Sequence, residues 1–251
     1  MKNFIDFTGK NIVVTGASSG IGKSTAIMLA NYNANVILIG RNVDTLEETN
    51  KDINNRGIIF KYDLTNIDDI ETLIKNIVKK VGALDGLVHC AGIGGARPLN
   101  LLTKNSVDNV MSVNFYAFVE LVRQFSKKNN FNKDSSVVVM SSIASIMGDK
   151  GKISYCASKA AVDAAVRCMA KELASKKIRV NSIRASWVRT NLYNDYLYKW
   201  QDNDIAADFI KRHYLGILDP EDVASMILFL LSNNSKKITG SSILIDSGSM
   251  A

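Results

Sequence analysis

A tyrosine and a lysine four residues apart, Tyr155 and Lys159, are the residues whose types and spacing most clearly allow chemistry. The alanine-rich segment around them favours a helix, which places both side chains on one face. A free tyrosine, with a pKa of about 10, exchanges protons poorly near neutrality. A neighbouring ammonium group, or the positive charge of an oxidised nicotinamide, is expected to lower that pKa. Ser142, thirteen residues before Tyr155, is placed to donate a hydrogen bond to the carbonyl oxygen that Tyr155 would protonate.

A glycine-rich turn, with Gly16, Gly20 and Gly22, follows the first apolar run of the chain. A strand-to-helix turn needs glycine where the backbone bends sharply and where it closely approaches a pyrophosphate. The N–H groups and the positive dipole end of the following helix then bind that anion. The spacing is GxxxGxG rather than the more common GxGxxG, but its place at the first strand–helix junction predicts a dinucleotide site. Three further residues of the turn are expected to line this site: Ser18, Ser19 and Ile21.

Gly40 and Arg41 end the second apolar run, at the position that distinguishes the two nicotinamide dinucleotides. An acidic side chain there would accept hydrogen bonds from a ribose 2′-hydroxyl and repel a 2′-phosphate. The guanidinium of Arg41 instead favours a phosphate, so NADP(H) is expected in preference to NAD(H). The alternative is a surface arginine with no ligand.

The elements that must position these residues are seven short apolar runs, rich in β-branched residues, that alternate with longer segments of helical periodicity. Near-continuous apolar strands are typical of a sheet covered on both faces. The pattern predicts an α/β fold, a doubly wound, parallel, seven-stranded sheet with helices on both faces (Rossmann-like). No linker or repeat interrupts it, so residues 1–251 are expected to form a single dinucleotide-binding and catalytic domain. The expected strands are 11–15, 35–39, 57–60, 86–90, 136–140, 178–183 and 242–245.

The segment near 190–216 breaks this rhythm, because aromatic residues stand among charged ones without a strand pattern. Two interpretations are open: a helical pair packed on the body of the domain, or a mobile substrate cap that excludes water from a cleft. The aromatic residues are Tyr193, Tyr196, Tyr198, Trp200, Phe209 and Tyr214.

Composition narrows the class of protein. The chain is 47% hydrophobic, and no run approaches the ~18 apolar residues of a membrane helix. Cys90, Cys156 and Cys168 lack metal-ligand or redox spacing, and the N-terminus lacks a secretory apolar run, so a cytoplasmic protein without a metal site is expected. The formal charge is +7, but basic residues are interspersed with acidic ones. A solvated surface, or a field that attracts anionic ligands, is therefore favoured over nucleic-acid binding.

With these motifs, the sequence from Lys10 to Gly248 resembles the short-chain dehydrogenase/reductase family, of the single-domain type. The resemblance implies that Tyr155 is the acid/base, that Ser142 polarises the substrate oxygen, and that Lys159 holds the nicotinamide ribose. It also implies that Asn114 supports a water-linked proton relay, whereas the residues alone indicate an amide that bonds locally within a helix. Further cofactor contacts implied by the resemblance are Asp63, Leu64, Cys90, Ala91, Gly92, Val188 and Thr190.

Three positions depart from the usual pattern of this family. Cys90 replaces an asparagine that braces neighbouring strands, and His89 before it is expected to be a packed or hydrogen-bonded core residue rather than a catalytic one. Ala185 and Ser186 replace a Pro-Gly pair, a change expected to loosen the loop beside the nicotinamide or to alter hydride geometry. Ser247 stands where glycine is frequent.

The leading hypothesis is an NADPH-dependent oxidoreductase that transfers a hydride between the cofactor and a carbonyl or secondary alcohol. A 3-oxoacyl thioester on acyl carrier protein is the first substrate class, because 219–224 and 238–240 resemble the acyl-carrier reductases. Lys133, Lys176 and Lys177 would then attract the acidic carrier near the cleft, unless they are ordinary solvated lysines. Alternatives are a reductase of a sugar or other small ketone, and a non-catalytic NADP-binding protein. The resemblance implies a homo-oligomer, a tetramer or dimer.

Overall fold

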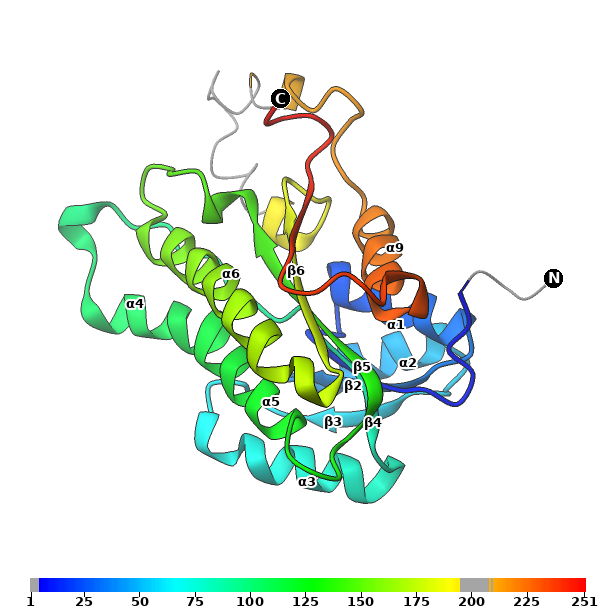
Figure 1. Ribbon diagram of the computed structural model, residues 1–251. Helices are drawn as coiled ribbons and strands as arrows, with labels where there is room; N and C mark the ends of the chain where they lie inside the picture. Colours follow the sequence, from blue (N-terminus) through cyan, green and yellow to red (C-terminus); the bar gives the residue numbers. More distant parts are fainter. Residues whose placement is uncertain (1–4, 195–207, 209) are drawn as a thin grey trace.

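Seven parallel strands form one sheet at the centre of the computed structural model, which describes residues 5–194, 208 and 210–251 (Figure 1). The strand order is β3-β2-β1-β4-β5-β6-β7, so the chain moves outward from β1 in one direction and then in the other. This topology confirms the predicted doubly wound, Rossmann-like fold. The strands are β1 (Asn11–Thr15), β2 (Asn35–Gly40), β3 (Ile58–Lys61), β4 (Leu84–His89), β5 (Phe131–Ser142), β6 (Arg179–Ala185) and β7 (Ser242–Ile245).

The helices cover both faces of the sheet, because successive strand residues point to opposite sides. Ile12 and Val14 pack in one apolar cluster, with residues of α1, α2 and α9, whereas Val13 packs in the other, with α3, α5 and α6. Figure 1 shows the same division of the helices. The helices are α1 (Gly20–Asn31), α2 (Val43–Asp52), α3 (Ile70–Val81), α4 (Lys104–Met111), α5 (Ala117–Phe125), α6 (Ile153–Leu173) and α9 (Pro220–Leu231). Short helical turns lie at Ile67–Asp69, Leu99–Leu101, Ser112–Tyr116, Ile143–Ser145, Ala174–Lys176 and Asn233–Ser235.

The strand β5 begins earlier than its apolar run predicts. Its pairing with β4 shifts register between Leu84 and Gly86, and Asp134 has a φ of 65°. This irregularity accommodates the polar residues that precede Ser136. An apolar pattern does not predict these residues to be part of the strand.

A buried arginine closes the end of α9. Arg179 Nη1 donates to Leu230 O at 2.6 Å and to Ser235 Oγ at 2.9 Å, and Nη2 donates to Leu231 O and Ser232 O at 3.2 and 3.1 Å. The guanidinium thereby satisfies carbonyl groups that have no partner within the helix. At the other end, Pro220 occupies the first helical position, as the sequence predicts.

The parallel arrangement separates the two ends of the strands. Ser142 ends β5 beside Ala185 of β6, at the carboxyl edge of the sheet. Lys133, Lys176 and Lys177 belong to the opposite end of these two strands, about 20–30 Å away at ~3.3 Å per residue. The expectation that these lysines lie near the cleft is therefore wrong within one chain. No helix in the described part of the chain is long and apolar enough to cross a membrane.

Candidate active site

The structure brings Ser142, Tyr155 and Lys159 together where α6 packs on β5 and β6. Ser142 and Tyr155 share a side-chain hydrogen bond, and Ser142 Oγ also accepts from Ala144 N–H at 3.2 Å. Lys159 Nζ lies 5.6 Å from the centroid of the Tyr155 ring and donates to Met140 O at 2.8 Å. The helical spacing of four residues and the end of one strand thus converge on a single point.

Burial dominates the proton affinities of this group. Burial raises the pKa of Tyr155, and the hydrogen bond with Ser142 only partly opposes it. Burial also lowers the pKa of Lys159 to about 8, against the effects of Cys90 and Asp163, which raise it. The net shift of the Tyr155 pKa is therefore upward, opposite to the lowering expected from a neighbouring ammonium. The physical reason is that desolvation disfavours both charged forms, the phenolate and the ammonium.

Asn114 lies in a π-helical turn, Ser112–Tyr116, between α4 and α5, and is fully buried. Its Nδ2 donates to Ile93 O and to Ser158 Oγ, both at 3.0 Å, and its Oδ1 accepts from Ile93 N–H at 2.8 Å. The residues alone indicate an amide that bonds within its own helix. In the structure, the Asn114 amide instead bonds to other elements. The wider π-helical turn orients the Asn114 side chain toward α6 and the loop after β4. The periodicity of the sequence does not reveal this turn.

The turn after β4 passes directly beside this group. A side chain on Gly92 would place its Cβ 3.3 Å from Asn114 Oδ1 and 3.5 Å from Lys159 Nζ. Ala91 N–H donates to Thr15 Oγ1 at 3.2 Å, so the backbone path holds although Cys90 lacks an amide. Burial raises the pKa of the Cys90 thiol to about 12, which keeps it neutral.

His89 is the packed, hydrogen-bonded core residue that the sequence predicts. It is 1% exposed, and its Nδ1 lies 3.0 Å from Thr15 Oγ1. Burial, with a smaller contribution from Lys159, lowers the pKa of His89 to about 3, so the ring is neutral at physiological pH.

The glycine turn before α1 is a tight cradle. A Cβ on Gly22 would lie 2.1 Å from Gly16 O, and one on Gly16, which has a φ of 65°, would lie 2.8 Å from Ala91 N. A Cβ on Gly20 would meet Thr190 Cγ2 at 2.9 Å. Only glycine fits at these points, so the backbone around the start of α1 can approach a pyrophosphate closely. Ser19 directly precedes the helix, and Ser18 and Ile21 flank these positions.

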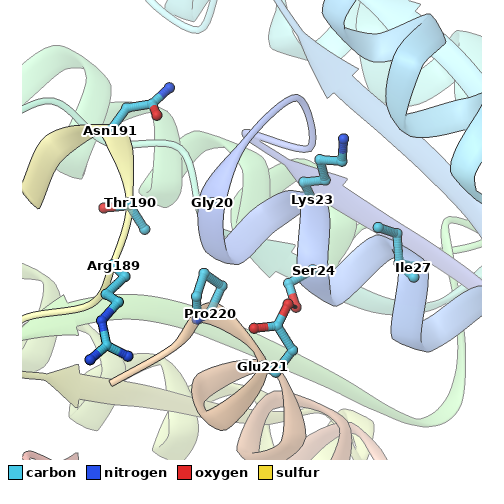
Figure 2. A pocket seen from close by; sticks show the side chains of 9 residues that line it. All are labelled: Gly20, Lys23, Ser24, Ile27, Arg189, Thr190, Asn191, Pro220 and Glu221. Atoms are coloured by element: carbon cyan, nitrogen blue, oxygen red, sulfur yellow. Dashed lines mark hydrogen bonds between the residues drawn. The ribbon is translucent and has the colours of Figure 1, made fainter. Parts of the chain in front are cut away.

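A hollow of about 250 Å³ adjoins this turn, between α1, the segment after β6 and the start of α9 (Figure 2). Figure 2 shows Thr190 near Gly20, and Glu221 beside Ser24, whose Oγ donates to Glu221 Oε1 at 3.0 Å. The other side chains around it are Lys23, Ile27, Arg189, Asn191 and Pro220. Thr190 is thus brought to the glycine turn, while Val188 is buried beneath it and paired with Leu218.

Arg41 and Asp63 lie at the ends of adjacent strands, β2 and β3. Tyr62 N–H donates to Gly40 O at 2.8 Å, which holds the two strand ends together. Hydrogen bonds from Thr65 lower the pKa of Asp63, and the nearby charge of Arg41 contributes. Leu64 is buried, so it anchors this end of the site.

The loop after β6 is tied down rather than loosened. Ser186 N–H donates to Ile245 O at 2.9 Å and extends the pairing of β6 with β7. Ser186 Oγ lies 2.8 Å from His213 Nε2. These two contacts oppose the loosening expected from Ala185 and Ser186 on this side of the loop.

The predicted cap segment is only partly described. Tyr193 packs edge-on against Trp187, with ring centroids 5.7 Å apart, and Tyr214 is 73% exposed. The other four aromatic residues, Tyr196, Tyr198, Trp200 and Phe209, lie outside the described residues.

Comparison with known proteins identifies the class. A family model described as enoyl-(acyl carrier protein) reductase matches residues 16–250. An L-xylulose reductase of Caenorhabditis elegans is 33% identical over 97% of this chain and 96% of its own length. A 3-oxoacyl-(acyl carrier protein) reductase of Thermotoga maritima is 32% identical over 96% and 97%. A dehydrogenase/reductase structure from Sinorhizobium meliloti superposes with a TM-score of 0.90 at 29% identity, covering 98% of this chain and 97% of that one.

The chain belongs to the short-chain dehydrogenase/reductase family. It is an oxidoreductase that acts on CH–OH and C=O groups, and the family uses a nicotinamide cofactor. The tight glycine cradle fits the pyrophosphate of such a cofactor, because Gly16, Gly20 and Gly22 place no side chain between the anion and the N–H groups at the start of α1.

Proposed function

We propose that this protein reduces a carbonyl group to a secondary alcohol with NADPH. The observation that carries the proposal is the meeting of Ser142, Tyr155 and Lys159 at the carboxyl edge of the sheet, beside Gly92 and Asn114. The carboxyl edge is where parallel α/β sheets place their ligands. The non-catalytic alternative has less support, because every polar group that the chemistry needs is present.

A bound nicotinamide cofactor would supply the hydride for the carbonyl carbon. Ser142 and Tyr155 would both donate hydrogen bonds to the carbonyl oxygen, and Tyr155 would pass its proton to that oxygen. The raised pKa of Tyr155 suits this direction, since the phenol keeps its proton until the oxygen becomes basic. The Lys159 ammonium would stabilise the phenolate that is left, and Asn114 would hold the backbone of Ile93 beside the relay that reprotonates it.

NADPH rather than NADH is proposed from the charge at the end of β2. Arg41 is exposed at that end, and the carboxylate near it, Asp63, already accepts two hydrogen bonds from Thr65, at 3.0 and 2.9 Å. The guanidinium is thus available for a 2′-phosphate. Arg41→Ala should raise KM for NADPH about tenfold or more and leave KM for NADH nearly unchanged, whereas equal changes for both would contradict this assignment.

A 3-oxoacyl thioester is the substrate class favoured by the rim of the site. Exposed apolar side chains stand on the segments that follow β4, β5 and β6, including short helical turns and the first residue of α6, namely Leu99, Leu101, Ile146, Ile153 and Leu192. Leu192 reaches Gly94 across the rim, because a Cβ added to Gly94 would lie 3.1 Å from Leu192 Cδ1. An apolar rim suits an acyl chain better than a polyol. A sugar or small ketone is the second candidate, because the L-xylulose reductase is 33% identical to this chain.

The test is NADPH oxidation by the purified protein with acetoacetyl thioesters, diketones and ketoses, each repeated with NADH. Tyr155→Phe should lower kcat about 100-fold or more while NADPH still binds. Tyr32→Phe, an exposed tyrosine at the far end of α1, is the matched control and should behave as wild type. Turnover that survives Tyr155→Phe would exclude the mechanism, and NADPH binding without turnover of any carbonyl would favour the non-catalytic alternative.

Homo-oligomerisation and a cytoplasmic location remain part of the proposal, on the strength of the family resemblance. An acyl carrier protein would be the partner of the thioester substrate. Sedimentation of the purified protein measures its oligomeric state. Comparison of acyl carrier and coenzyme A thioesters of the same acyl group measures the contribution of the carrier.

A further inference from the structure

Three segments far apart in the sequence meet at the hydroxyl group of Ser186. Its Oγ lies 2.8 Å from His213 Nε2 and 3.3 Å from Ser249 Oγ. His213 is 4% exposed and Ser249 is 8% exposed, so these contacts are shielded from water. A polar pair in such surroundings holds its geometry, because breaking it leaves buried polar atoms without partners.

The backbone on either side of Ser186 and His213 is paired as well. Leu218 N–H donates to Trp187 O at 3.2 Å, and Arg189 N–H donates to Leu218 O at 2.8 Å. The rings of Trp187 and His213 lie 6.2 Å apart. Residues 213–218 therefore run as a strap along the loop formed by residues 186–190.

This loop joins two parts of the proposed site. Its first end follows Ala185, which pairs with Ser142 in the sheet. Its other end is Thr190, whose methyl group lies against Gly20 of the glycine turn. Neither Ala185 nor Ser186 has a ring that restricts φ, so contacts must supply the rigidity of the loop.

We propose that His213 is a positioning residue, which acts through Ser186 to hold loop 186–190 between the proton-transfer group and the cofactor cradle. Loss of the contact should leave the fold intact but let the loop shift. A displacement of about 1 Å at such a point can lower the rate about 100-fold. The kinetic part of this inference rests on the proposed function, whereas the tether itself does not.

The kinetic test compares Ser186→Ala, His213→Leu, His213→Gln and the double variant Ser186→Ala/His213→Leu. The two disruptive single variants should each lower kcat/KM about 10- to 100-fold, while His213→Gln, whose amide can reach Ser186, should recover most of the activity. The double variant should be no worse than either single one, because both remove the same contact. Leu215→Ala, at a 90% exposed position in the strap, is the matched control. Wild-type kcat/KM in both single variants, or additive losses in the double variant, would overturn the proposal.

A second measurement reads the loop without catalysis. In a Trp200→Phe background, Trp187 is the sole tryptophan of the chain, and its near-ultraviolet circular dichroism reports its packing on His213 and Tyr193. Ser186→Ala, which removes the contact but keeps the His213 ring beside Trp187, should change this signal, and Leu215→Ala should not. An unchanged signal in a folded Ser186→Ala protein would overturn the tether. A changed signal without turnover of any carbonyl would support the tether and count against the proposed function alone.

Discussion

Gly22→Ala tests whether the turn before α1 holds the cofactor pyrophosphate. A Cβ at this position would lie 2.1 Å from Gly16 O and 2.7 Å from Gly16 C. Ordinary contacts of a Cβ begin near 3.4 Å, so the turn and the first residues of α1 must separate by about 1.3 Å, the difference from 2.1 Å. The obstacle is backbone on both sides, which no side-chain rotation can relieve.

The magnitude follows from that displacement. The N–H groups at the start of α1 would move away from the phosphate by a comparable distance, and a misplacement of about 1 Å costs roughly 100-fold. We therefore expect Kd for NADPH to rise about 100-fold, which corresponds to about 2.7 kcal/mol. Overpacking should also lower the free energy of unfolding by about 1–3 kcal/mol.

The assay is a fluorescence titration of each protein with NADPH, together with its thermal unfolding to show that the variant is folded. Gly148→Ala is the matched control, because a Cβ there meets nothing within 4 Å. Wild-type affinity for NADPH in a folded Gly22→Ala protein would refute the placement of the pyrophosphate at this turn.

Three further predictions concern buried ionisable groups. Arg179→Met should lower the free energy of unfolding by about 1–3 kcal/mol in urea, since it removes the hydrogen bond to Leu231 O and one of those to Leu230 O, which keeps its bonds from Ser136 Oγ and Ser235 Oγ. An unchanged midpoint would contradict this cap. His89 has a folded pKa of about 3, below the ordinary histidine value of 6.5, so the unfolded chain binds more protons between these values. Wild-type stability should therefore fall as pH drops through that window, by up to about 1.4 kcal/mol per pH unit, and His89→Asn should remove that part of the slope in acid titrations of unfolding. Because the Lys159 ammonium has a pKa of about 8 that Asp163 raises, kcat/KM for reduction should fall above about pH 8, and Asp163→Asn should move that fall to lower pH. A fall that Asp163→Asn leaves in place would contradict the role of Asp163.

Local patterns in the sequence were sufficient to predict the strands and the sheet topology of this protein. Apolar runs such as Val36–Ile39 identify strands because both faces of a parallel sheet are covered. Two other patterns are equally local. The glycines lie within one strand-to-helix turn, and Tyr155 and Lys159 are one helical turn apart. Ser142 could be placed because it ends a recognisable strand, and parallel strands share one carboxyl edge.

Other features depend on groups that meet only when the chain is folded. The register shift in β5 and the π-helical turn at Asn114 leave no periodic signal, because each is set by what packs against it. The contact between Ser186 and His213 joins residues whose partners no spacing predicts.

The sequence by itself determined which groups are available for proton exchange and where along the chain they stand. Only the tertiary structure decided how strongly they hold those protons. The spacing of Tyr155 and Lys159 indicates an ammonium that lowers the pKa of the phenol, whereas burial raises the pKa of Tyr155 and lowers that of Lys159. Desolvation depends on every atom that surrounds a group, and those atoms come from distant parts of the chain.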